Sequence, residues 1–164
     1  MDEAQFWSII EAARRQAGSV PDERVEALQN LLSALDLDAV AAFQRQYERM
    51  IARAHRWDLW GAAYLINEGC SDDGFRYFCD WLISEGRATF EQALADPDTL
   101  ALLPYQELAE LEMFGYVALA VYQQKCGRAL ALDQATALSL PAGDEWCEEE
   151  LPGLFPRLAA KYWG

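Results

Sequence analysis

Apolar residues recur along most of this chain at intervals of three and four, the spacing that places side chains on one face of an α-helix. The first segment shows the pattern clearly, with Phe6, Ile9 and Ile10 on one stripe. Asp2 and Gly18 flank that segment and are suited to begin and end a helix. The pattern predicts helices over 2–17, from 19–21 onward, from 36–38 onward, and over 57–67, 71–85, 87–94, 105–125 and 155–163.

These segments predict an all-α fold, a single compact bundle-like domain over residues 1–164 with about seven or eight helices. No segment of useful length shows the alternation of apolar and polar residues that is typical of a strand. Residues 128–153 are expected to be mostly loop, because they contain two prolines, two glycines and the acidic run 144–150. The Asp96-Pro97-Asp98 triplet predicts a turn and a new helix start.

The stretch 57–86 is expected to be the centre of the fold. Its first part, 57–67, is apolar nearly all round and should be buried. Gly69 should end that helix and Ser71 should cap the next. Asp72 and Asp73 then fall in its first turn, where the helix dipole favours each carboxylate by about 0.3 to 1 kcal/mol.

The chain carries a net charge of −14, with 27 acidic and 13 basic residues. The imbalance is greatest over 57–104, where nine acids and two bases give −7. So few cations argue against binding to nucleic acid or to an anionic membrane, and the acidity favours a basic partner or divalent cations. The predicted third helix has the one basic face, through Arg45, Arg49, Arg53 and Arg56, which is either solvated or paired with the acidic middle.

No apolar run approaches the 18 to 20 residues, roughly, that span a bilayer, and the first ten residues do not resemble a secretory signal. The four cysteines have no metal-binding spacing, so a reduced cytoplasm is expected, with each cysteine a small core residue. No cofactor motif is present, and no cofactor is expected.

The joint between the two central helices is the best candidate for chemistry. It places three oxygen-bearing side chains, Ser71, Asp72 and Asp73, on consecutive residues. Grouped carboxylates can hold a hard cation or act as acid and base. The simpler interpretation is that Ser71 caps the helix while the aspartates complement its dipole. Four further aspartates could converge on the joint if the helices fold back: Asp58, Asp80, Asp96 and Asp98.

Aromatic residues around the joint are either core or the lining of a pocket or partner surface. Arg76 lies four residues before Asp80, so the two should form an ion pair along one helix. Trp146 is unusual within the acidic run, and we expect it to pin that loop to the body of the protein. The aromatic candidates are Trp57, Trp60, Tyr64, Tyr77 and Trp81.

Several of these motifs together resemble an uncharacterised bacterial family, the domain of unknown function numbered 4240. The resemblance covers most of the chain, and it implies family membership and an independent domain but no activity. The matching residues are Phe6-Trp7, Trp57-Asp-Leu-Trp60, Ala62-Ala63-Tyr64, Gly69-Cys-Ser-Asp-Asp-Gly-Phe75, Tyr77-Phe78, Trp81-Leu-Ile83, Gly86 and Asp96-Pro97-Asp98.

We therefore expect an interaction module that binds a protein or small-molecule partner through the acidic joint around Ser71–Asp73. The partner should be basic if electrostatics decide the contact. The alternative is a hydrolase-like enzyme that uses clustered carboxylates with or without a divalent cation. A structural or oligomerising domain is a third interpretation.

Overall fold

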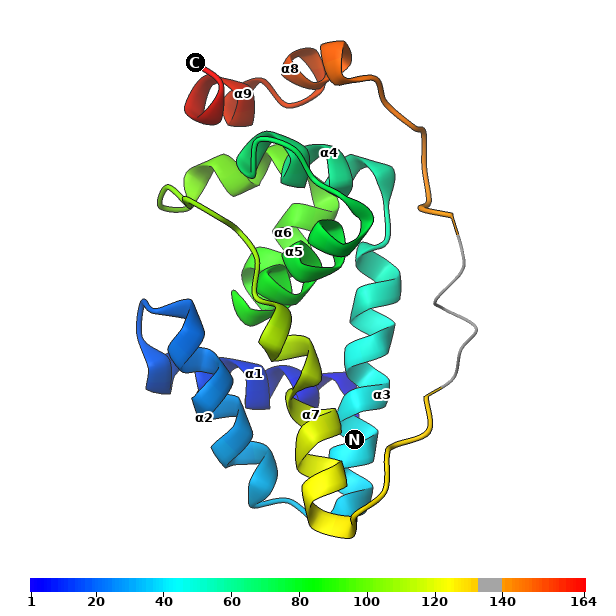
Figure 1. Cartoon of the computed structure of the whole chain (residues 1–164). Helices are drawn as coiled ribbons and strands as arrows, with labels where there is room; N and C mark the ends of the chain where they lie inside the picture. Colours follow the sequence, from blue (N-terminus) through cyan, green and yellow to red (C-terminus); the bar gives the residue numbers. More distant parts are fainter. Residues whose placement is uncertain (133–139) are drawn as a thin grey trace.

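The computed structural model describes residues 1–132 and 140–164 (Figure 1). These residues form helices joined by turns and loops, with no strand among them, which confirms the all-α fold. No helix in the described part of the chain is both long and apolar enough to cross a membrane. The elements are α1 Glu3–Ala17, α2 Pro21–Ser33, α3 Leu37–Ala54, α4 Trp57–Ile66, α5 Asp72–Ser84, α6 Arg87–Ala95, the 3₁₀ helix η1 Pro97–Leu102, α7 Glu112–Cys126, the 3₁₀ helix η3 Glu148–Glu150, α8 Leu151–Leu154 and α9 Pro156–Tyr162.

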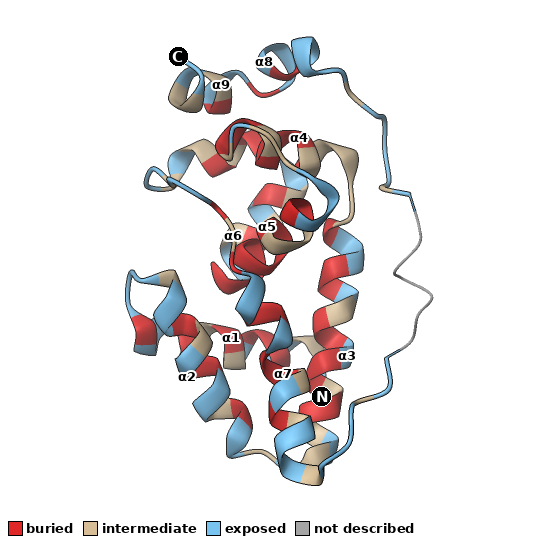
Figure 2. Ribbon diagram, viewed as in Figure 1, coloured by how far each residue is buried: buried red, intermediate tan, exposed pale blue. Residues whose placement is uncertain are grey.

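The helices form an elongated arrangement with α3 and α7 side by side along its length (Figure 1). α1 and α2 pack together at one end, where α2 also contacts α7. α4, α5, α6 and η1 form the other end, and α8 and α9 lie over α4 there. Buried residues line the helix faces that point toward one another (Figure 2), so one apolar cluster runs from α1 to α9.

Local capping accounts for several helix starts. The Asp2 carboxylate accepts a hydrogen bond from the Gln5 amide at 2.8 Å, and the Gln5 side chain bonds back to the Asp2 amide at 2.9 Å. Asp36 accepts from the Ala39 amide at 2.8 Å. Each of these bonds satisfies an amide that has no partner within its helix, so the start is encoded by neighbouring residues.

The helix expected over 105–125 is shorter, because α7 begins only at Glu112. The preceding segment uses its backbone for tertiary bonds. The Asn67 side chain accepts from the Ala109 amide at 2.8 Å and donates to the Ala109 carbonyl at 3.3 Å. The Leu111 amide donates to the Tyr77 carbonyl at 3.0 Å. Leu108, within this segment, is 57% exposed.

Two other expectations need correction. The described residues of 128–153 are mostly loop as expected, except that residues 148–153 are helical, and residues 133–139 lie outside the described part. The cysteines were all expected in the core, but Cys79 is the buried one and Cys147 is exposed. Cys70 and Cys126 are intermediate, because both follow or end a helix near the surface.

Candidate functional site

The central joint begins with a helix cap. The Ser71 hydroxyl accepts a hydrogen bond from the Gly74 amide at 3.1 Å, as the sequence predicts. Asp72 and Asp73 follow in the first turn of α5, and both are exposed. The cap confirms the structural role of Ser71, and it leaves the two aspartates facing solvent beside the helix dipole.

The carboxylates at the start of α5 lie close to those at the start of α7. Glu110 lies against the first turn of α5, where a Cβ added to Gly74 would stand 3.2 Å from its Oε1. The pKa of Tyr77 is raised by desolvation and then by Glu112 and Asp73. We call this region the acidic–tyrosine surface, and it consists of Asp72, Asp73, Tyr77, Glu110, Glu112 and Tyr116.

No member of the acidic–tyrosine surface forms an ion pair within the described residues. Burial and then the nearby like charge of Glu112 raise the pKa of Glu110. Tyr116 is 48% exposed, and the adjacent Met113 is 60% exposed. The surface therefore combines uncompensated negative charge with accessible apolar area.

Asp80 lies apart from this surface, inside the protein, with only 2% of its area exposed. Its carboxylate accepts a hydrogen bond from the Tyr47 hydroxyl at 2.6 Å, and Arg76 Nε lies 3.5 Å away. Arg76 also contacts Glu48 at 3.3 Å. A Cβ at Gly115 would stand 2.6 Å from Asp80 Oδ1, so α7 approaches α5 closely only because this residue is glycine.

Burial raises the pKa of Asp80 from 3.8 to about 6, against the opposing effects of Arg76 and Tyr47. The predicted ion pair with Arg76 is confirmed. The carboxylate is enclosed by Tyr47, Arg76 and Gly115, and this arrangement links α3, α5 and α7.

The remaining aspartates serve other contacts. Asp58 pairs with Arg56, and both line a hollow of about 510 Å³ with Trp146 and Phe155. Asp96 caps η1 by accepting from the Asp98 amide at 3.1 Å. The fold thus separates the six predicted aspartates instead of gathering them in one cleft. Among the described residues, no three His, Cys, Asp or Glu side chains lie close enough to hold a metal ion.

The aromatic candidates form part of the packing around the joint. Trp57 stacks on Trp60 at 5.2 Å, and Trp60 stacks on Phe75 at 5.0 Å. The Trp60 indole donates to the Cys70 carbonyl at 2.9 Å, which ties α4 to the joint. Trp81 is 1% exposed and is core.

Tyr64 and Trp57 instead face the C-terminal part of the chain. The Tyr64 hydroxyl donates to Glu148 at 2.9 Å. The Trp146 indole donates to the Trp57 carbonyl at 2.6 Å and packs against the Tyr64 ring at 5.3 Å. Trp146 contacts the body of the protein as predicted.

The basic face of α3 is partly neutralised by the acidic middle of the chain. Arg53 forms a two-point contact with Glu91 at 2.8 and 2.9 Å. Arg56, expected on the same face, lies beyond the end of α3 at the start of α4 and pairs with Asp58. Arg45 and Arg49 form no ion pair among the described residues, so that part of the face is solvated. Both interpretations of this face therefore hold, each for part of it.

Sequence reasoning missed Glu110, Glu112 and Tyr116 as neighbours of the joint. Residues 105–125 were predicted to form one helix, so Glu110 was expected in the middle of a helix and not in the segment that precedes α7. Sequence reasoning also missed Tyr47 as the hydrogen-bond donor to Asp80. The two residues are 33 positions apart, and no local pattern indicates such a pairing.

Residues 1–124 match the profile of a family described as a protein of unknown function (DUF4240). No curated protein and no solved structure gives a significant match to the chain. The match spans most of the chain and includes the joint, the buried Asp80 contacts and the start of α7. The chain therefore belongs to the DUF4240 family.

Proposed function

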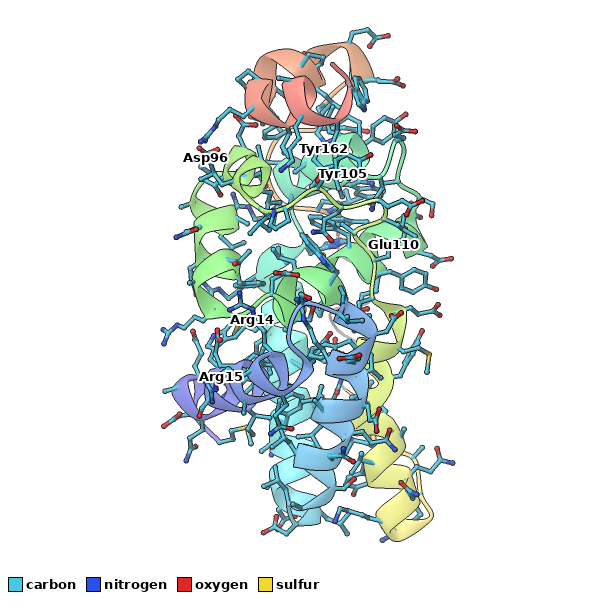
Figure 3. The ribbon with its side chains drawn as sticks, turned by 90° about the vertical axis from the view of Figure 1, so that its left-hand side faces the viewer. Arg14, Arg15, Asp96, Tyr105, Glu110 and Tyr162 are labelled. Atoms are coloured by element: carbon cyan, nitrogen blue, oxygen red, sulfur yellow. The ribbon has the colours of Figure 1, made fainter. Side chains whose placement is uncertain are left out.

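We propose that this protein is an interaction module that binds a basic segment of a partner protein on its acidic–tyrosine surface. The proposal is carried by one observation: carboxylates from the first turn of α5 and from the start of α7 lie near Tyr77 and form no ion pair among the described residues. Glu110 marks this surface beside α5 (Figure 3).

The chemistry of the surface suits lysine and arginine side chains. Opposite charges steer association and select partners, and uncompensated carboxylates have no internal cation to displace. Tyrosine rings add contact area and can face a bound cation. Exposed Met113 extends the apolar area at the edge of the surface.

Hydrogen bonds to backbone groups hold the acidic–tyrosine surface in a fixed conformation, which supports the proposal. The Leu111 amide bonds to the Tyr77 carbonyl at 3.0 Å, and Asn67 holds Ala109 through two hydrogen bonds. These bonds fix the segment that carries Glu110 relative to α5. A binding surface that is already ordered loses less conformational entropy when its partner arrives.

The test uses a short fluorescent peptide of alternating Lys and Ser, and its counterpart with Glu in place of Lys. The wild-type chain should bind the lysine peptide, with an affinity that falls as salt is raised. The variant Asp73→Asn/Glu110→Gln/Glu112→Gln should lose about tenfold in affinity or more, because three of the attracting charges are gone.

The matched control is Glu26→Gln/Glu145→Gln/Glu149→Gln, which removes three exposed acids that make no ion pair or side-chain hydrogen bond among the described residues. It has the same net charge as the first variant and should keep the wild-type affinity. Equal losses in both variants would show that net charge alone attracts the peptide. Equal binding of the lysine and glutamate peptides would also refute the proposal.

A further inference from the structure

The C-terminal segment, residues 142–163, packs over α4 and η1 through α8 and α9. Figure 3 shows Asp96, Tyr105 and Tyr162 at the boundary between this segment and the rest of the protein. The segment lies outside the part of the chain that matches the family, which ends at residue 124. The surface that receives it, which we call the α4–η1 groove, comprises Gly61, Tyr64, Asp96, Asp98, Ala101 and Leu103.

A glycine on α4 makes room for the apolar side of the segment. A Cβ added to Gly61 would stand 2.9 Å from both Leu151 Cδ2 and Phe155 Cε2, and 3.0 Å from the Trp146 indole nitrogen. Leu151 and Leu158 are completely buried, and Phe155 is 6% exposed. Leucine or phenylalanine therefore recurs at intervals of four and three. Phe155 separates α8 from α9, so these apolar side chains are shared between two short helices.

Carboxylate and carbonyl oxygens of the groove accept hydrogen bonds from the N–H groups of α9. The buried Asp98 carboxylate accepts from the Leu158 amide at 2.9 Å, and from the amide and Nε of Arg157 at 3.1 and 3.2 Å. Asp96 accepts from Arg157 at 3.1 Å. Lys161 donates to the carbonyls of Ala101 and Leu103.

The segment depends on the groove for its structure. α8 has four residues and α9 has seven, and isolated helices of such length do not persist in water. In a chain with net charge −14, residues 155–164 carry two bases and no acid. Both bases contact the groove, so α9 matches it in charge, whereas the acids of the segment all lie before it, at residues 144–150.

We propose that the α4–η1 groove is a binding site for a short, basic, amphipathic helix of a partner protein, and that the C-terminal segment occupies it as an autoinhibitory ligand. A partner would present leucine or phenylalanine to the Gly61 notch and a basic residue to Asp96. It would also offer backbone amides to Asp98. The groove shares no residue with the acidic–tyrosine surface, so the two proposals can fail separately.

The test releases the segment in the full-length chain through Leu151→Gln/Phe155→Gln/Leu158→Gln, which leaves every residue of the groove unchanged. The probe is a fluorescein-labelled synthetic peptide of residues 142–164 with Cys147→Ser. The released variant should bind the peptide with a Kd well below about millimolar, because linkage to the chain supplies an effective concentration of that order and the natural contact is formed. The wild-type chain, whose groove is occupied, should bind at least about tenfold more weakly.

Asp98→Asn in the released variant should weaken peptide binding about tenfold, since a charged acceptor of three hydrogen bonds is lost. A peptide with Leu158→Asp is the matched control and should not bind. Hydrogen exchange of α1 to α7 and far-UV circular dichroism report whether the released variant remains folded. If the amides of α1 to α7 lost their protection from hydrogen exchange in the released variant, the segment would be part of the core, and this result would overturn the proposal.

A second variant, which removes only the polar contacts of the C-terminal segment, tests the proposal if the triple variant unfolds. Arg157→Glu/Lys161→Glu removes the polar contacts while the apolar anchors remain, and it should raise peptide binding above that of the wild type. Equal binding by wild-type and both variant chains, or no binding by any of them, would equally contradict an occupied groove.

Discussion

Replacing Asp80 by Asn should stabilise the protein at neutral pH relative to acidic pH. Asp80 is buried among Tyr47, Arg76 and Gly115, and burial raises its pKa from 3.8 to about 6. The folded chain therefore holds a proton between these two pH values, where the unfolded chain has released it. The stability that this proton contributes is complete below about pH 4 and is lost as the pH rises through 6.

The size of the effect follows from the shift. Two pKa units correspond to about 3 kcal/mol between the protonated and ionised forms. About half of that change, near 1.5 kcal/mol, falls between pH 5 and pH 7.5 by the same linkage. Asparagine has nearly the same shape as the protonated acid and carries no charge, so the variant should lack this pH-dependent loss.

Urea unfolding of the wild type and Asp80→Asn at pH 5 and pH 7.5 measures the difference. The stability of the variant relative to the wild type should increase by about 1.5 kcal/mol over that interval. Tyr47→Phe removes a hydrogen bond that lowers the pKa of Asp80, and it should move the pH-dependent step to higher pH. The reasoning would be refuted if the difference in unfolding free energy between the two proteins stayed constant with pH, or changed in favour of the wild type as the pH rises. Either result would show that the Arg76 contact offsets or outweighs burial.

Two further predictions concern other buried groups. Arg24 and Glu85 form a buried ion pair at 2.7 Å, so Arg24→Met should lower the free energy of unfolding in urea by about 3 to 5 kcal/mol. Changing both residues to Met should recover much of this loss, because no unpaired charge is then left buried. A double variant as unstable as the single variant would contradict this account. Among the thiols, exposed Cys147 should react first with a disulfide reagent. Cys70 should react slowly, because burial and then Glu110 and Asp72 raise its pKa to about 12, and buried Cys79 should react only on unfolding. Mass spectrometry of the modified peptides gives the order, and early labelling of Cys79 would refute it.

The structure bears out those sequence predictions that depend on neighbouring residues. The caps at Asp2, Asp36 and Ser71 each bond an amide three residues ahead, so the chain encodes them within one turn. The Arg76–Asp80 pair is also local, four residues apart on α5. In contrast, the Asn67 side chain bonds both backbone groups of Ala109 from 42 positions away, and helical spacing alone gave no sign of this contact.

The candidate site was predictable only in part for the same reason. The exposed carboxylates at the start of α5 follow from the cap and the helix dipole. Their proximity to Glu110 and Glu112 depends on how the segment before α7 folds back on α5. Asp96-Pro97-Asp98 reads as a turn, yet Asp98 is buried because α9 covers it.

By itself, the sequence determined the helical fold, the main helix starts, the membership of an uncharacterised family and the acidity of the central joint. These features arise from side-chain spacing, capping bonds within one turn and net composition. The tertiary structure alone decided which acids lie together, which are enclosed and where the C-terminal segment docks. Those outcomes join residues far apart in the sequence, 33 positions for Tyr47–Asp80 and 60 positions for Asp98–Leu158. Such pairs form only when the packing of whole helices brings them within hydrogen-bonding distance.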